Sequence, residues 1–67
     1  MLISTFYESN GKAGRAEVYK DSHLGYYIEF YRADGSLITT EYFTNHSIHY
    51  VEDAAENWAL GIKLLNE

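Results

Sequence analysis

The chain has 67 residues, a formal net charge of −5 and no cysteine. A chain of this length forms at most one domain and buries only about 60% of its unfolded surface, so its stability must come from dense packing or from association with another chain. Without cysteine, disulfides and thiolate metal sites are excluded. The acidic balance disfavours contact with nucleic acid phosphates, and we expect no nucleic acid partner.

Hydropathy disfavours two further classes of protein, those that span a membrane and those that carry a signal peptide. No segment approaches the ~18 consecutive apolar residues of a membrane-spanning helix. The first nine residues, MLISTFYES, lack the basic start and the long apolar run of a signal peptide. We therefore expect a cytoplasmic protein without a membrane partner.

The N-terminal third of the chain predicts two strands. Residues 2–8 carry apolar side chains at both odd and even positions, which is typical of a strand covered on both sides. Residues 10–14, NGKAG, predict a turn. Residues 15–20 then predict a second strand with Ala16 and Val18 on one face.

The clearest strand is the third, residues 26–32, which follows a turn at residues 21–25. Its alternation places Ile28 on one face and Glu29 on the other. Residues 33–35, Ala-Asp-Gly, then predict a three-residue hairpin loop with a left-handed glycine and a bulge. The fourth strand is expected at residues 37–43.

The length of this loop sets the predicted register. A three-residue loop pairs Ile28 with Thr40, and it leaves Tyr42 on the face of Ile28 and Phe43 on the opposite face. A two-residue loop would instead pair Ile28 with Glu41, which suits a buried face less well. The sequence therefore favours the first register.

The C-terminal third predicts one amphipathic helix. Apolar residues recur every three or four positions and form one stripe: Ile48, Val51, Ala55, Trp58, Ile62 and Leu65. Ser47 is a good N-cap. Gly61 lies inside the pattern, where it costs about 1 kcal/mol relative to alanine, and Lys63 is expected near the negative end of the helix. Residues 1–67 are therefore expected to form one small α+β domain, an antiparallel sheet of three to four strands packed on a single C-terminal amphipathic helix.

Several short segments resemble the YegP-like family of small bacterial domains. They are residues 17–21 (EVYKD), 33–47 (ADGSLITTEYFTNHS) and 55–63 (AENWALGIK). The resemblance implies a three-stranded sheet with a helix, and it assigns no activity to any residue. This chain departs from the family in having one copy where tandem copies are common, and in the added strand at residues 2–8.

Residues 50–58, YVEDAAENW, are also similar to small proteins encoded by marine cyanobacterial phages. This resemblance implies a phage-encoded protein that acts in the cytoplasm of an infected bacterium.

The loop GKAG at residues 11–14 contains two glycines and a lysine. A phosphate-binding loop needs a longer glycine spacing and a Lys-Ser/Thr pair at the start of a helix. Because this loop leads into a strand, we interpret it as a flexible hairpin.

The polar side of the predicted helix carries an acidic helix face, Glu52, Asp53 and Glu56, next to His49. With His46 these residues could suggest a metal site, but such a site needs partial burial and fixed supporting partners. We interpret the face as a solvated helix surface and expect no metal and no cofactor.

Glu29 and Glu41 share one face in the predicted register, beside several tyrosines. This arrangement leaves one alternative open, a tyrosine-lined cleft around Glu29 and Glu41 that binds a small molecule or supports acid–base chemistry. No serine nucleophile has a plausible base beside it, so we expect no catalytic residue and no enzyme.

Aromatic residues are the unusual feature of this sequence, with seven Tyr, three Phe and one Trp. One helix covers one face of a sheet, and the other face then exposes an apolar patch of Tyr27, Tyr31, Leu37 and Phe43, larger than most monomers expose. Tyrosine is enriched at protein interfaces because it buries area and keeps a polar tip. We therefore predict an interface here, with a homodimer as the commonest arrangement.

The leading functional hypothesis is a non-enzymatic protein-binding or regulatory module that acts as a homodimer. An unknown protein partner would contact the aromatic sheet face or the acidic helix face.

Overall fold

The computed structural model describes residues 1–9, 12–63 and 65. Four strands precede one helix: β1 (Leu2–Tyr7), β2 (Arg15–Asp21), β3 (Gly25–Tyr31), β4 (Leu37–Phe43) and α1 (Ile48–Ala59). The strands form one antiparallel sheet in the order β1-β2-β3-β4. The predicted α+β class is therefore confirmed, and the N-terminal strand belongs to the same sheet as an edge strand.

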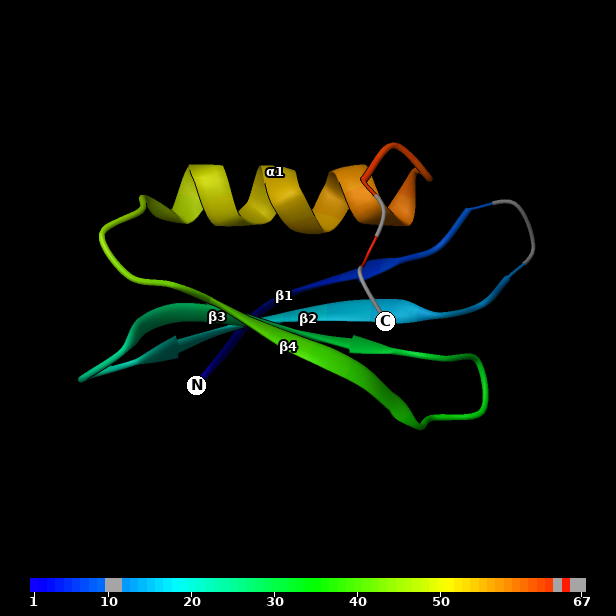
Figure 1. Cartoon of the computed structure of the whole chain (residues 1–67), viewed down its shortest axis with the longest axis horizontal. Coiled ribbons are helices and arrows are strands. Elements are labelled where there is room, and N and C mark those ends of the chain that lie inside the picture. The colour runs from blue at the N-terminus through cyan, green and yellow to red at the C-terminus, as the bar shows by residue number, and fades with distance from the viewer. Residues whose placement is uncertain (10–11, 64, 66–67) are drawn as a thin grey trace.

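The helix lies along one face of the sheet (Figure 1), where it packs on β1, β2 and β3. The fully or nearly fully buried side chains are Ala16, Val18, Ile28, Phe30, Val51, Ala55, Trp58 and Ala59. The Trp58 ring packs edge-on against Phe30, with centroids 5.1 Å apart. This core follows from period-two burial in β2 and β3 meeting the apolar stripe of the helix.

The β3–β4 hairpin differs from the predicted register. Its loop is as expected, because the Arg32 N–H donates to the Ser36 carbonyl and Gly35 is left-handed at φ 91°. A bulge at Ile38 then shifts the pairing by one residue, so that Ile28 lies opposite Glu41 and not Thr40. The predicted pairing beyond the loop was wrong.

Burial explains why the bulge is favourable. Ile38, the extra residue of the bulge, packs against the core, and the shift also turns Phe43 onto the helix side of the sheet. Glu41 lies on that side as well, where its carboxylate is still partly exposed and pairs with the Lys63 ammonium at 3.5 Å. The unfavourable position of one carboxylate is offset by the partial burial of Phe43, which the predicted register would leave on the opposite face.

The helix begins as predicted and ends earlier than predicted. At its start, the Ser47 hydroxyl accepts a hydrogen bond from the Tyr50 N–H at 3.2 Å. At its end, Gly61 is left-handed at φ 83°, its N–H donates to the Trp58 carbonyl, and the Ile62 N–H donates to the Asn57 carbonyl. This is a Schellman motif, which terminates a helix.

Three expectations about the helix end are corrected by this motif. Gly61 is a terminating residue and not an interior one, Lys63 lies beyond the helix, and Ile62 is 70% exposed and leaves the apolar stripe. Within the described part of the chain, the structure contains no helix that is both long enough and apolar enough to cross a bilayer. Asn10 and Gly11 of the predicted first turn lie outside the described residues.

Candidate functional site

The side of the sheet opposite α1 is the main candidate surface, and we call it the open sheet face. No described element packs on it (Figure 1). The strand register and the alternation of the pleat place these side chains on it: Leu2, Thr5, Tyr7, Arg15, Glu17, Tyr19, Tyr27, Glu29, Tyr31, Leu37, Thr40 and Tyr42. Seven of these twelve positions are apolar or aromatic, and five of the seven are tyrosines.

One cross-strand row of this face holds three tyrosines on successive strands, with Leu2 of β1 at its end opposite Tyr19. Tyr27 lies opposite Tyr19 on one side and opposite Tyr42 on the other. The rings of Tyr19 and Tyr27 stack with centroids 5.0 Å apart and planes 8° apart, and Tyr42 lies 5.7 Å from Tyr27 at a tilt of 39°. Such cross-strand aromatic pairs stiffen a sheet and present a continuous flat surface.

The neighbouring row sets two carboxylates side by side. Glu17 lies directly opposite Glu29, and Thr40 follows Glu29 in the same row. Like charges in directly opposed positions destabilise a sheet unless they are compensated. The compensation differs between the two residues.

Glu17 is well supported by its neighbours. Its carboxylate accepts hydrogen bonds from the Arg15 Nε at 2.7 Å and from the Tyr19 hydroxyl at 2.5 Å. The Arg15 guanidinium also lies over the Tyr31 ring, 4.3 Å from its centroid. The two hydrogen bonds, that from Arg15 first, lower the pKa of Glu17 below its usual range.

Glu29 has a single contact of this kind among the described residues: its Oε1 accepts a hydrogen bond from the Tyr31 hydroxyl at 2.7 Å. That hydrogen bond raises the pKa of Tyr31 to about 12. The Tyr19 hydroxyl shows the same effect, since its hydrogen bond to Glu17 raises its pKa well above the usual value. Among the described residues, no cationic side chain pairs with Glu29.

Three of the four predicted interface residues lie on the open sheet face, namely Tyr27, Tyr31 and Leu37. Phe43 does not, because the bulge in β4 turns it toward the helix side, where it packs edge-on against His46 and Tyr50. Its inclusion was wrong.

Sequence reasoning missed Tyr7, Tyr19 and Tyr42 as members of this face. Tyr19 could have been found, because Ala16 and Val18 define the buried side of its strand and leave odd-numbered residues on the other side. Tyr42 could not, because its orientation depends on the bulge.

The predicted cleft around Glu29 and Glu41 does not exist. Glu29 points to the open sheet face, and Glu41 points to the helix side, where it pairs with Lys63. The two carboxylates are therefore separated by the sheet itself, and the pairing that suggested acid–base chemistry is corrected.

The acidic helix face is divided in the structure. Asp53 and Glu56 are exposed, but Glu52 leans onto β1 and accepts a hydrogen bond from the Ser4 hydroxyl. His46 stacks on Tyr50 with centroids 4.2 Å apart. In the ranges that the structure describes, no three or more acidic, histidine or cysteine side chains are grouped to hold a metal ion.

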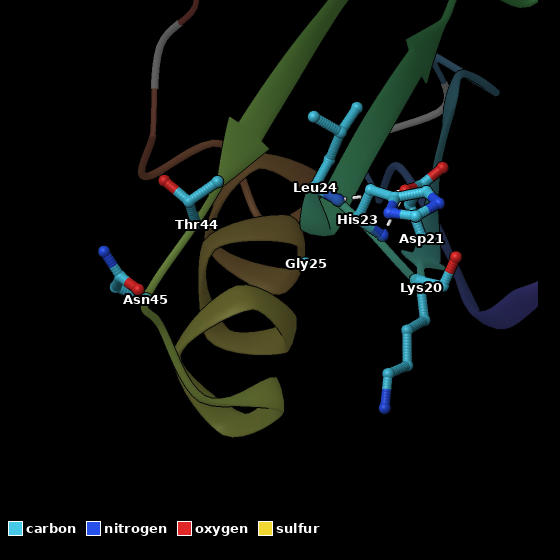
Figure 2. A pocket seen from close by; sticks show the side chains of 8 residues that line it. Lys20, Asp21, His23, Leu24, Gly25, Thr44 and Asn45 are labelled. Carbon is cyan, nitrogen blue, oxygen red and sulfur yellow. Dashed lines mark hydrogen bonds between the residues drawn. The ribbon is translucent and has the colours of Figure 1, made fainter.

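A shallow pocket of about 300 Å³ lies at one end of the sheet, between the β2–β3 turn and residues 44–45 (Figure 2). The Asp21 carboxylate in this pocket accepts hydrogen bonds from the Leu24 and His23 N–H groups, and these bonds, that from Leu24 first, lower its pKa. Its charge is thus used to shape the turn, so we do not assign a ligand to this pocket.

Comparison of the chain with protein-family models, with curated proteins and with solved structures found no match. The resemblance to the YegP-like family stays a prediction from the sequence.

Proposed function

We propose that this protein is a non-enzymatic binding module whose open sheet face docks onto another protein. One observation carries the proposal: a tyrosine-rich sheet face that no described element covers, with Tyr42 60% and Tyr7 70% exposed. Tyrosine buries a large area on docking and loses little side-chain entropy, so it is frequent at the centre of protein interfaces. We place this activity in the cytoplasm, which is the host cytoplasm if the chain is encoded by a phage.

The acidic helix face gives weaker support for a contact surface. Glu52 is engaged with Ser4, and only Asp53 and Glu56 remain as exposed carboxylates. Isolated exposed charges contribute little to affinity. We therefore propose the open sheet face as the contact surface in preference to the helix.

A homodimer through the same face stays a prediction from the sequence, and its charges weigh against it. The open sheet face carries the Glu17 and Glu29 carboxylates and the Arg15 guanidinium. Face-to-face packing of two copies would bring four carboxylates together with two guanidiniums. Burying the excess charge would cost stability, so we propose a second protein as the occupant.

Two matched tyrosines allow a test of the docking face. Tyr42 is 60% exposed on the open sheet face, and Tyr50 is 53% exposed on the helix. We would replace each in turn by a photocrosslinking phenylalanine derivative, irradiate cells that naturally produce the chain, and compare the crosslinked products. The proposal expects a discrete protein adduct from position 42 and none from position 50. An adduct from position 50 alone, or none from either position, would overturn it.

A further inference from the structure

The structure assigns a chemical character to the protein that docks on the open sheet face: we infer that it presents a basic side chain, preferably arginine, to Glu29. The inference rests on the proposed docking function and deepens it. It starts from the unequal compensation of the two carboxylates at the centre of the face.

Glu29 lies at the centre of the open sheet face, so a protein that docks on this face meets its carboxylate. It is half-buried, its strand lies inside the sheet, and Tyr27 and Tyr31 flank it on the same side of β3. A protein that covers these tyrosines must also cover the carboxylate. Burying an ionised carboxylate without a cation is strongly unfavourable, so a stable complex needs a positive charge at this point.

The protein itself does not supply that charge from its described residues. Among the described residues, Glu29 accepts one hydrogen bond, which the neutral Tyr31 hydroxyl donates to its Oε1. Arg15 is directed to Glu17, which it contacts at 2.7 Å. The remaining carboxylate oxygen of Glu29, Oε2, has no hydrogen-bond donor among the residues that the structure describes.

The same face shows how a guanidinium is held on it. Arg15 donates to the Glu17 carboxylate while its guanidinium lies 4.3 Å from the centre of the Tyr31 ring. Carboxylate pairing together with contact to an aromatic ring favours arginine over lysine, because guanidinium is planar and weakly hydrated. An arginine from a partner would pair in the same way with Glu29, whose carboxylate lies opposite Glu17 on the neighbouring strand.

Charge complementarity also selects among occupants. A second copy would bring an Arg15 that is already paired, and a nucleic acid would bring phosphates to an acidic protein. A basic protein segment satisfies both the tyrosine surface and the carboxylate. We therefore commit to a protein partner that places an arginine at the centre of its contact surface.

The test uses hexa-arginine peptide as the probe and two matched variants of the full chain. Glu29→Gln removes the central carboxylate, and Glu56→Gln removes an exposed carboxylate from the helix, so both change the net charge equally. Binding is followed at low ionic strength by the chemical shifts of backbone amides. Circular dichroism spectra that match the unmodified protein confirm that both variants fold.

The inference expects shifts centred on Glu29 and its neighbours in β3 and β4. It also expects Glu29→Gln to weaken binding by about five-fold while Glu56→Gln leaves it nearly unchanged. Equal weakening by both variants would reveal general attraction to an acidic protein and would overturn the inference. Shifts confined to the helix would overturn it too.

Two further probes separate the remaining occupants. Spermidine binding at Glu29 as tightly as hexa-arginine would assign the site to a small polyamine and not to a protein. Shifts that grow with protein concentration in the absence of peptide would assign it to a second copy. If Glu29 shows no selectivity but position 42 still crosslinks to a protein, this inference fails and the docking function stands; if the crosslink is also absent, both fail.

Discussion

The two faces of this sheet are built from the same strands and differ completely in chemistry. In β3, Ile28 and Phe30 are fully buried under the helix, whereas Tyr27 and Glu29 alternate with them on the open sheet face. Among the described residues, no polar or charged side chain is fully buried on the helix side, where Glu41 stays partly exposed. The open sheet face instead combines aromatic area with paired carboxylates. The buried apolar side chains and the tyrosines and carboxylates of the open sheet face therefore lie on opposite sides of one layer, because side chains in a strand alternate with a period of two.

The largest loss of stability is expected from a change on the buried side of the sheet. Replacing Trp58 by alanine removes the ring that packs on Phe30, and we expect the free energy of unfolding to fall by about 3–5 kcal/mol. Because small domains are only marginally stable, this variant should be largely unfolded at room temperature. Urea titration followed by circular dichroism measures the change.

The control for this variant is Tyr42→Ala on the open sheet face, which removes an aromatic side chain that is mostly exposed. We expect a loss below about 1 kcal/mol, mainly from its contact with Tyr27. Similar losses for the two variants would contradict the division into a stabilising helix side and an open sheet face that contributes little to stability.

A second, smaller change in stability is expected at the end of the helix that covers the sheet. Gly61→Ala places a Cβ on a left-handed residue, so we expect destabilisation by about 1 kcal/mol. A glycine inside a helix would give the opposite sign, because alanine stabilises a helix interior by about the same amount. The sign of the shift in the thermal unfolding midpoint therefore decides between the Schellman motif and a longer helix.

A third prediction concerns self-association through the open sheet face. If the Glu17 and Glu29 carboxylates keep two copies apart, the unmodified protein should be monomeric at high micromolar concentration near neutral pH. Replacing both by glutamine leaves the tyrosine surface without its charge, and we expect a measurable increase in dimer by light scattering. A dimer of the unmodified protein that Tyr27→Ser dissociates would instead support the homodimer predicted from the sequence.

The smallest expected effect is the alkaline behaviour of the same face. Tyr31 has its pKa raised from 10.0 to about 12 by the Glu29 carboxylate. Its contribution to stability is therefore complete below pH 10 and is lost as the pH rises toward about 12. Ultraviolet absorbance of tyrosinate, compared between the protein and its Tyr31→Phe variant, should show the late-titrating group. In Glu29→Gln this group should titrate earlier, and an unchanged titration would contradict the hydrogen bond.

Much of the fold could be predicted because its signals are local. The buried pair Ala16 and Val18 in the second strand, the Ala-Asp-Gly loop at residues 33–35, and the Ser47 cap each depend on residues close in sequence. Period-two and period-3.6 apolar patterns then determined which sides of the strands and helix meet. These features required no knowledge of distant contacts.

Two positions of the candidate site were decided by the tertiary structure. The bulge at Ile38 turns Phe43 away from the open sheet face and Tyr42 onto it, because packing of Ile38 and Phe43 against the core outweighs a regular ladder. The same shift separates Glu41 from Glu29.

The sequence by itself determined that this protein is an antiparallel sheet of three to four strands with one helix and a surplus of tyrosine on the uncovered side; the place of β1 at the edge of the same sheet came from the structure. Only the tertiary structure decided that Tyr42 joins that surface and that Glu29 lies on it without a cation from the described residues. The physical reason is that alternation along a strand is local, whereas register and charge pairing across strands depend on side chains far apart in sequence.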